Sequence, residues 1–395
     1  MQFAQKFYKK TVAYTHGTHT AQFEVSQELF SSQTVDAGTQ RLLRTLLFEH
    51  VDTYKKVLDL GCGYGPLGII LKMQCPAAEV HLVDVDALAL AFTAQNAALN
   101  GVSDVQIYPS FGYDGVTGTD FDLIVSNIPA KVGDSVVRDF IQNARFHLAP
   151  AGRVVIVVID ALADFVHTEL TRDETISVLF HKNWPGHHVY HFTFTAAKTE
   201  QVEELSRTHV YGQELPLQIG KNTFNFDVSY NLPEFDELSY DTELLLGLLE
   251  EMSLQHSKIL CCNSGQGFIP CFLALTKQPE SLTIIDRNLL ALETTAHNLS
   301  KVPATARVLH QVELTSGVED LDVITFLFPE KTEPAVCEAY LDQLSGQVRQ
   351  KGRVVLASSS TALTRVEAVV ALLSDFKCSD RKRKKGRSAL VLTRK

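Results

Sequence analysis

The sequence predicts two tandem, doubly wound, Rossmann-like α/β domains, each with a mostly parallel sheet that ends in an antiparallel hairpin. Segments rich in Val, Ile and Leu alternate along the chain with helix-like segments, and these strands lack strict apolar–polar alternation. Such strands are typical of a parallel sheet covered by helices on both faces. The chain has 395 residues, more than a typical domain with one hydrophobic core contains. Its second half also repeats the first.

The elements of the first half follow a lead-in at residues 1–50. A helix is expected to start within Asp36–Thr39, before an apolar run that includes Leu42 and Leu46. Strands are then predicted at 56–60, 79–84, 105–108, 121–126 and 153–158, and helices at 67–73, 87–100, 135–148 and 161–170. Strands 176–180 and 188–194 close the half as a hairpin turning at Trp184-Pro185-Gly186.

The second half repeats the first segment by segment. The matches are FEVS at Phe23 with FDVS at Phe226, VLDLGCGYG at Val57 with ILCCNSGQG at Ile259, HLVDVDALALAFTAQN ending at Asn96 with TIIDRNLLALETTAHN ending at Asn298, FDLIVSNIPAK with LDVITFLFPEK, and the GRVV segments at Gly152 and Gly352. Two copies of one fold are expected rather than a solenoid. The predicted domains are 1–200 and 201–395, with a boundary between Ala197 and Gln218.

The second copy has lost polar residues and kept structural ones. Asp59 becomes Cys261, Gly61 becomes Asn263 and Asn127 becomes Leu327, whereas Gly63, Gly65 and Asp84 keep counterparts in Gly265, Gly267 and Asp286. This pattern favours a second copy retained for its shape. The alternative is that it binds a different ligand.

The stretch Val57–Gly68, VLDLGCGYGPLG, carries the clearest functional signal. An apolar strand breaks into three alternate glycines and gives way to a helix, with Pro66 at its first turn. Glycine lets a ligand approach the backbone, although a tight βα turn without a ligand also uses glycine.

Two classes of cofactor fit this loop. Gly63-x-Gly65-x-x-Gly68 matches the dinucleotide fingerprint, and Asp84 could hold ribose hydroxyls, so an NAD enzyme is a competitor. However, Asp59 precedes the loop, where an acid would repel a pyrophosphate at the helix N-terminus. An acid there suits a cationic group, such as the ammonium of S-adenosylmethionine.

Composition narrows the class of protein. No apolar run is long enough to cross a bilayer, the N-terminus lacks a secretion signal, and the seven cysteines are scattered. We expect a cytoplasmic protein with reduced thiols, no membrane contact and no metal. A monomer is compatible with these features. The net charge of −10 argues against broad nucleic-acid binding, but one dense basic run could contact an RNA backbone. Its cations are Arg381, Lys382, Arg383, Lys384, Lys385 and Arg387; a solvated loop is the alternative.

The motifs together resemble a known family. Asp59-x-Gly61-x-Gly63-x-Gly65, Asp84 after the second strand and Asn127-x-Pro129 after the fourth look like a class I S-adenosylmethionine-dependent methyltransferase. LFSSQTVDAGTQRLL followed by VLDLGCGYGPLGI resembles the small-domain type. That group includes rRNA guanine-N2 methyltransferases, some of them tandem duplications whose inactive copy usually comes first.

The resemblance implies a role for each matching position. Asp59 and the loop of Gly61, Cys62, Gly63 and Gly65 would hold the methionine part of the cofactor. Asp84 would bind the ribose, Ser110 and Phe111 would border the adenine, and Asp36, Gly38 and Thr39 would close the pocket. An acid usual near Phe111 is missing here.

The tetrad Asn127-Ile128-Pro129-Ala130 is the predicted catalytic site. The Asn127 oxygen and the Ile128 carbonyl can accept the two hydrogens of an exocyclic amine, and Pro129 stiffens the turn. An ordinary turn is the alternative for an isolated Asn-x-Pro. The usual fourth residue is aromatic and stacks on the substrate; with Ala130 here, stacking would fall to Tyr113, Phe111 or Phe30.

The expected function is methylation of a guanine N2 amine in rRNA by the first copy, with RNA docking by the second. The alternatives are a methyltransferase for a protein amide or small molecule, and a non-catalytic RNA-binding or assembly factor.

Overall fold

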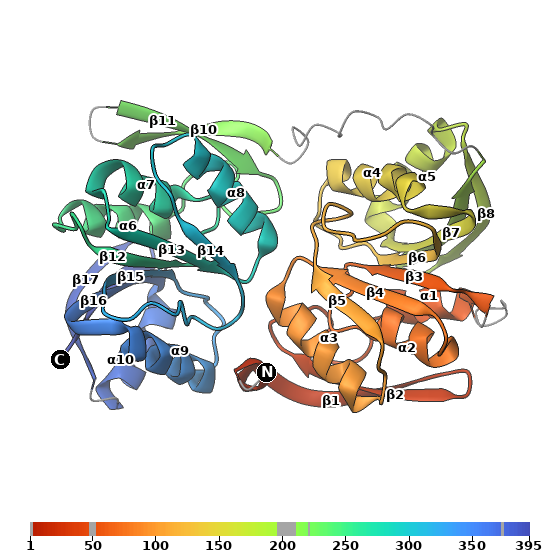
Figure 1. Ribbon diagram of the computed structural model, residues 1–395, viewed down its shortest axis with the longest axis horizontal. Coiled ribbons are helices and arrows are strands. Elements are labelled where there is room, and N and C mark those ends of the chain that lie inside the picture. The colour runs from red at the N-terminus through yellow and green to blue at the C-terminus, as the bar shows by residue number, and fades with distance from the viewer. Residues whose placement is uncertain (1–2, 47–52, 196–210, 220–221, 373–374) are drawn as a thin grey trace. The chain divides into compact units, whose positions relative to one another are not determined.

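The computed structural model describes residues 3–46, 53–195, 211–219, 222–372 and 375–395 (Figure 1). They form two compact units, of which the first begins at Phe7 and the second spans Tyr211–Lys395. Each unit holds a mostly parallel seven-stranded sheet that ends in an antiparallel hairpin, so the predicted fold class is confirmed. The predicted boundary between Ala197 and Gln218 falls largely on residues 196–210, outside the described residues, and division at residue 200 stays a prediction.

The sheet of the first unit has the strand order β5-β4-β3-β6-β7-β9-β8. Its strands are β3 (Lys56–Leu60), β4 (Glu79–Asp84), β5 (Val105–Pro109), β6 (Phe121–Asn127), β7 (Leu148–Ile159), β8 (Ile176–Trp184) and β9 (His187–Phe194). Strands β3 to β7 are parallel, and β9 runs antiparallel to both β7 and β8. The chain winds outward from β3 in one direction and from β6 in the other. This reversal is the switch point at which open α/β sheets bind ligands, beyond the carboxyl ends of the strands.

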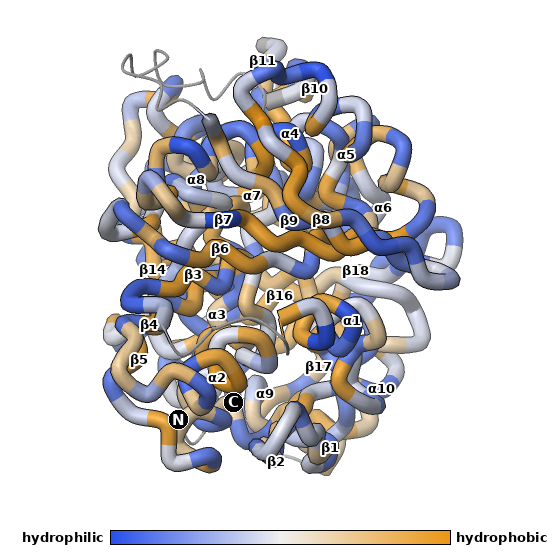
Figure 2. Tube along the Cα trace, turned by 90° about the vertical axis from the view of Figure 1, so that its right-hand side faces the viewer, coloured by the Kyte–Doolittle hydropathy of each residue, from blue (hydrophilic) through white to orange (hydrophobic). Residues whose placement is uncertain are grey.

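Helices cover both faces of this sheet (Figure 1). They are α1 (Ala37–Leu46), α2 (Pro66–Gln74), α3 (Ala87–Leu99), α4 (Asp134–Gln142) and α5 (Asp160–Arg172). Helices α1 to α3 lie on one face, and α4 and α5 lie on the other. Apolar residues run along the covered strands of the sheet (Figure 2), and the side chains of Ile124 and Val155 are fully buried. The double cover explains why these strands show no alternation of polar and apolar residues.

The lead-in contains a hairpin that the sequence analysis did not predict. Strands β1 (Tyr8–His16) and β2 (His19–Ser26) pair antiparallel. Asn96 of α3 fastens the hairpin, because its Oδ1 accepts from Glu24 N at 2.7 Å and its Nδ2 donates to Glu24 O at 3.0 Å. The same amide donates to Tyr64 O at 2.9 Å and so ties the hairpin to the glycine loop.

The prediction of a helix at 135–148 is wrong at the C-terminal end of that range. Helix α4 ends at Gln142, and a 3-10 turn covers Asn143–Phe146. Phe121 N donates to His147 O at 2.9 Å, and Phe121 pairs with Leu148. These bonds draw the segment into the sheet as the start of β7.

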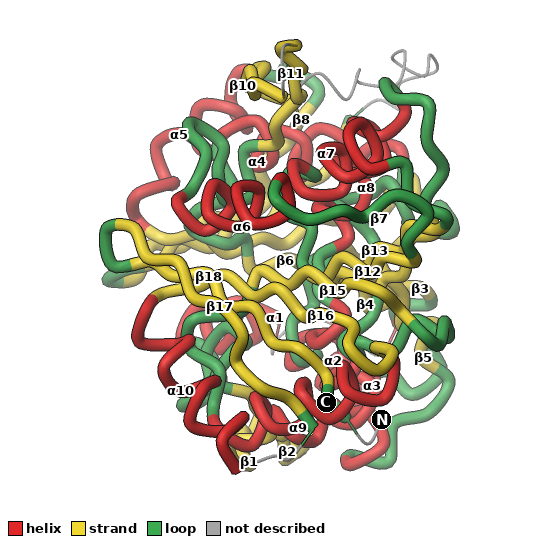
Figure 3. The backbone as a smooth tube through the Cα atoms, turned by 90° about the vertical axis from the view of Figure 1, so that its left-hand side faces the viewer, coloured by secondary structure: helices red, strands yellow, loops and turns green. Residues whose placement is uncertain are grey.

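The second unit repeats this arrangement with the order β14-β13-β12-β15-β16-β18-β17 (Figure 3). Its elements are β10 (Tyr211–Ile219), β11 (Asn222–Ser229), α6 (Tyr240–Glu250), β12 (Lys258–Cys262), α7 (Phe268–Lys277), β13 (Ser281–Asp286), α8 (Leu289–Ser300), β14 (Arg307–His310), β15 (Leu321–Leu327), α9 (Pro334–Gln347), β16 (Val348–Ser359), α10 (Ser360–Leu372), β17 (Phe376–Lys384) and β18 (Arg387–Arg394). Asn298 repeats the bonds of Asn96, to Asp227 N and O and to Gln266 O. The duplication therefore preserves the hairpin and its fastening.

Two further properties follow from the described residues. All seven cysteines are free thiols, and all but Cys378 are buried. None of the helices in the described ranges combines the length and the apolar character that crossing a bilayer requires.

Candidate functional site

The glycine loop leaves β3 at its carboxyl end and leads into α2. Cys62 N donates to Val83 O at 2.9 Å, which anchors the loop to β4. Gly61 and Gly63 have φ angles of 76° and 58°, a left-handed conformation that favours glycine. A Cβ atom built on either residue would meet nothing within 4 Å. A tight turn explains the positive φ, and the open space beside both glycines is what a bound ligand needs in addition.

Asp59 lies beneath this loop and is fully buried. Its Oδ2 accepts from Gly68 N at 2.8 Å, whereas its Oδ1 has no hydrogen-bond partner in the described part of the chain. Burial raises the pKa of the Asp59 carboxyl to about 7, with a further contribution from the charge of Asp84, and the Gly68 N–H opposes the shift. An orphaned carboxylate oxygen in a core calls for a cationic partner. The site therefore fits an ammonium group better than a pyrophosphate.

Asp84 ends β4 beside the loop. Its Oδ2 accepts from Gly63 N at 2.8 Å and its Oδ1 accepts from Asp86 N at 3.0 Å. Burial raises the pKa of Asp84 to about 6 despite these bonds. Each carboxylate oxygen keeps a further lone pair, so hydroxyl groups of a ligand could bind here.

Cys62 contributes only its backbone to this loop. Its Sγ lies 3.6 Å from the hydroxyl of Thr93 on α3, and burial holds the pKa of the thiol well above its usual value. The thiol is therefore a packing group and not a nucleophile.

Ser110 follows β5, and its backbone N–H donates to Asp84 O at 3.1 Å. Its hydroxyl donates to Gly112 O at 2.7 Å and accepts from Gly115 N at 2.9 Å. Phe111 is half-buried against the core. The Ser110 side chain thus shapes its own loop, which leaves the backbone and the Phe111 ring to border a ligand.

Asn127 is the last residue of β6, and its side-chain Nδ2 donates to Asp36 Oδ2 at 2.9 Å and to Thr39 Oγ1 at 3.1 Å. Ile128 N donates to Val157 O at 3.0 Å and its side chain is buried, whereas Pro129 and Ala130 are exposed. The structure thus joins the predicted catalytic residue Asn127 to two residues that were predicted to close the cofactor pocket.

The Asp36 side chain also caps the N-terminus of α1. Its Oδ2 also accepts from Gly38 N at 2.7 Å and from Thr39 N at 3.2 Å, which caps the helix. A Cβ atom on Gly38 would lie 2.8 Å from Asp36 Oδ2 and 2.9 Å from the His187 ring. A larger residue at position 38 would therefore require the Asp36 or the His187 side chain to move.

The sequence analysis missed Tyr64, which lies inside the glycine loop. Its side chain is buried, and its hydroxyl has no partner among the residues that the structure describes. Burial raises the pKa of Tyr64, and the nearby charge of Asp36 raises it further. The second copy has Gln266 here, whose amide donates to Ser229 O and Pro233 O. This difference between the repeats was a signal in the sequence.

The three rings proposed for stacking differ in availability. The Tyr113 ring is buried, stacks on His147 at 4.8 Å and donates through its hydroxyl to Phe140 O at 3.2 Å. Phe111 is half-buried, whereas Phe30 is 71% exposed. Of these rings, only Phe30 is freely accessible.

The basic run covers the end of β17, the turn and the start of β18, at the tip of this hairpin. Most of its cations contact acids: Arg381 pairs with Glu367, Lys382 with Glu251, Lys384 with Glu243, and Arg387 with Asp241 and Glu330. Lys385 donates to the hydroxyl of Tyr240 at 2.8 Å. Arg383 is exposed, and no acid in the described ranges pairs with it. These ion pairs offset much of the charge on which the RNA-docking prediction rests.

The second glycine loop lacks the buried acid that the first has at Asp59. Burial raises the pKa of Cys261 to about 12, so this residue stays neutral where the first unit has an acid. Asn263 Nδ2 donates to Leu327 O at 2.9 Å, which uses its amide within the fold. Asp286 still accepts from Ser264 N at 2.7 Å. The loop is thus retained without the orphaned carboxylate.

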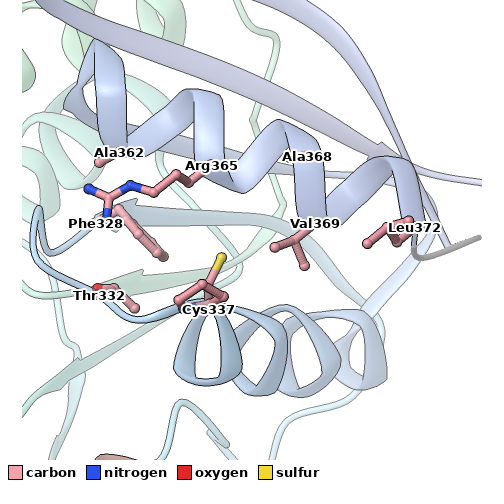
Figure 4. Close-up of a pocket in the computed structure, with 9 residues that line it drawn as sticks. Phe328, Thr332, Cys337, Ala362, Arg365, Ala368, Val369 and Leu372 are labelled. Carbon is pink, nitrogen blue, oxygen red and sulfur yellow. The ribbon is translucent and has the colours of Figure 1, made fainter.

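The second unit also has an apolar pocket of about 190 Å³ between α9 and α10 (Figure 4). Phe328, Cys337 and Val369 are among its lining residues. Arg365 points across it but donates to Glu330 O at 2.8 Å. Binding sites need a few convergent polar groups to orient a ligand. The lining of this pocket is mainly apolar and does not supply such a set of polar groups.

Comparisons with known proteins agree on the first unit. Residues 20–171 match the methyltransferase small domain family. The uncharacterized protein YbxB of Bacillus subtilis is 32% identical over 137 residues, which cover 34% of this chain and 67% of that protein. Ribosomal RNA small subunit methyltransferase C of Mannheimia succiniciproducens is 40% identical over 134 residues, 33% of this chain and 38% of the relative. The same-named protein of Pasteurella multocida is 39% identical over 133 residues, 33% of this chain and 39% of its own length.

A solved structure matches the complete architecture. It is the T. thermophilus 16S rRNA N2 methyltransferase RsmC in complex with AdoMet and guanosine. The two chains superpose with a TM-score of 0.71 over 99% of this chain and 100% of the other, at 14% sequence identity. At that identity the likeness concerns the fold, including its duplication.

Proposed function

The chain belongs to the methyltransferase small domain family of S-adenosylmethionine-dependent enzymes, and we propose that its first unit methylates the exocyclic N2 amine of a guanine in ribosomal RNA. One adjacency carries the proposal. Strand β6, which ends at Asn127, pairs directly with β3, which ends at the open glycine loop. Donor and acceptor groups would therefore meet at the switch point of the sheet. The rRNA acceptor is proposed from the two rRNA methyltransferases similar to this region.

The residues around the loop suit the methyl donor. S-adenosylmethionine supplies an electrophilic methyl group on a sulfonium centre. The orphaned Oδ1 of Asp59 would bind its ammonium, with the backbone of Gly61 and Gly63 alongside. The two oxygens of Asp84 would accept hydrogen bonds from the ribose hydroxyls. The NAD alternative is disfavoured, because a buried anion at Asp59 repels a pyrophosphate.

The acceptor amine would bind at Asn127 and Ile128. The Asn127 Oδ1 and the Ile128 carbonyl would accept its two hydrogens and aim the nitrogen lone pair at the methyl group. Positioning of this kind supplies most of the catalysis. The methylated amine then releases a proton to solvent, so the site needs no strong base.

Docking of RNA by the second unit is a separate proposal based on the basic run. Because its other cations have partners, we expect Arg383 to contribute most. Arg383→Ala should reduce the salt dependence of RNA binding by about one counterion. An unchanged salt dependence would exclude docking through this hairpin.

The main test is transfer of labelled methyl from S-adenosylmethionine to unmodified ribosomal RNA and small ribosomal subunits. Nucleoside analysis should find the label in N2-methylguanosine. Label in a protein fraction or a small molecule instead would support the alternative acceptors. Calorimetric binding of the cofactor without transfer to any fraction would support a non-catalytic RNA-binding factor.

A further inference from the structure

We propose that Asp36 and Thr39 are positioning residues that lock the orientation of the Asn127 side chain, so that the site accepts only substrates presenting an N–H donor. The sequence analysis placed both residues in closure of the cofactor pocket. Their contacts point to a different role. The proposal rests on the proposed methyl transfer and adds residues and a substrate chemistry to it.

The chemistry of the partners fixes which end of the amide faces which way. A carboxylate accepts hydrogen bonds and donates none, so the Asn127 atom at 2.9 Å from Asp36 Oδ2 must be Nδ2. The Thr39 hydroxyl lies 3.1 Å from the same nitrogen. Both amide hydrogens are thereby used, and Oδ1 is directed away from Asp36. An accepting oxygen at the reaction centre selects an amine over a carbonyl or other pure acceptor.

The second unit provides an internal comparison. Ser239 caps α6 where Asp36 caps α1, and Thr242 N donates to Ser239 Oγ at 3.2 Å, as Thr39 N donates to Asp36. Leu327 ends β15 where Asn127 ends β6.

With the asparagine lost, the buried Thr242 hydroxyl has no partner in the described part of the chain. The cap thus survives a change to serine. What disappears together is the carboxylate, the amide and the bond between them. A role of Asp36 in helix capping alone does not account for this joint loss.

These contacts also define variants that separate positioning from folding. Asp36→Ser should keep the cap, as Ser239 does, but its short side chain cannot reach Asn127. Asp36→Asn keeps an accepting oxygen at the same length, and the Gly38 and Thr39 N–H groups hold that oxygen in the position of Asp36 Oδ2. Thr39→Val removes the hydroxyl and Thr39→Ser keeps it. Thr242→Val in the second unit is the matched control, because it removes a hydroxyl that holds nothing.

The test measures kcat, KM and cofactor affinity for each full-length variant. Asp36→Ser and Thr39→Val should lower kcat by about 10- to 100-fold, the scale of a misplaced reacting group, with cofactor affinity unchanged. Asp36→Asn, Thr39→Ser and Thr242→Val should stay near the wild-type rate. A loss of cofactor affinity with unchanged kcat would overturn the proposal in favour of pocket closure. Equal losses in Asp36→Asn and Asp36→Ser would also overturn it.

A second readout does not depend on the substrate. In protein that contains isotope-labelled asparagine, NMR should show slow hydrogen exchange of the Asn127 side-chain amide in the wild type. Exchange should be fast in Asp36→Ser and slow in Thr242→Val. Fast exchange in the wild type would overturn the locked orientation. Slow wild-type exchange together with absent RNA methylation would instead overturn only the proposed function.

Discussion

Asp59 accepts a hydrogen bond from Gly68 N at 2.8 Å through Oδ2, while its buried Oδ1 has no partner in the described part of the chain. Burial raises the pKa of this carboxyl from 3.8 to about 7. The folded protein therefore binds the proton more tightly than the unfolded chain, and stability falls as pH rises from about 4 to about 7. The shift corresponds to about 4 kcal/mol at the high end of that range. The buried charge of Asp59 therefore destabilises the folded protein until a bound cation neutralises it.

The first prediction concerns Asp59→Asn. An amide can still accept from Gly68 N but carries no charge, so the free energy of unfolding at pH 8 should rise by about 1–4 kcal/mol. Affinity for S-adenosylmethionine should fall by about 10- to 100-fold, as expected for a lost charged hydrogen bond. Urea unfolding and calorimetry measure the two effects. The stability gain should shrink as pH falls and vanish below about pH 3, where the wild-type carboxyl is protonated in both the folded and the unfolded state. Unchanged cofactor affinity would remove Asp59 from the binding site.

The second prediction concerns the pH dependence of cofactor binding to the wild type. An ammonium binds the ionised form of Asp59, so affinity should fall by about tenfold per pH unit below about 7. Below about 6 the decrease should steepen as Asp84 protonates. Calorimetry in buffers of different ionisation enthalpy should detect proton release on binding at pH 6.5. Asp59→Asn should lack the transition near pH 7. A flat wild-type profile contradicts the assignment.

The third prediction compares matching acids of the two units. Asp84 and Asp286 both accept a hydrogen bond from their glycine loop, from Gly63 N and Ser264 N. Asp84→Asn should weaken cofactor binding by about 10-fold or more, whereas Asp286→Asn should leave it unchanged. Equilibrium dialysis with labelled cofactor gives both affinities and the number of sites per chain. Two sites per chain would show that the second unit binds the cofactor as well.

The fourth prediction concerns the catalytic side chain. Asn127→Ala should lower kcat by about 10²- to 10³-fold, as for removal of a positioned hydrogen-bond partner in other enzymes. Cofactor affinity should be retained. Leu327→Ala is the control at the matching position of the second unit and should leave kcat unchanged. Near-normal turnover by Asn127→Ala would show that Asn127 is not the residue that positions the acceptor amine.

The fifth prediction concerns the missing aromatic at Ala130. Phe30 is the exposed ring of the three candidates, so Phe30→Ala should weaken the interaction with an RNA acceptor by about 1–3 kcal/mol, seen as a higher KM. Phe30→Trp should preserve stacking and keep the KM low. If both variants match the wild type, Phe30 does not stack on the acceptor.

The sequence predicted the parts that depend on local pattern. The apolar strands, the glycine loop at Gly61–Gly65 and the duplication are visible as periodicity, turn chemistry and repetition, and the structure agrees with each. The hairpin of β1 and β2 was missed, although its strands pair locally across the turn at Gly17-Thr18. Its attachment to α3 through Asn96 is a long-range contact that no local pattern encodes. The link from Asn127 to Asp36 joins positions far apart in the chain, and no local pattern encodes such a contact. The partners of the basic run, such as Glu243 and Lys384, were hidden for the same reason.

The orphaned hydroxyl of Thr242 also gives the difference between the two units an energetic side. A buried hydroxyl without a partner costs about 1–3 kcal/mol. In the first unit the Asn127 amide donates to the matching hydroxyl of Thr39, whereas Leu327 of the second unit offers no polar side-chain group to Thr242. The second unit therefore carries this cost at the position where the first unit holds its predicted catalytic side chain.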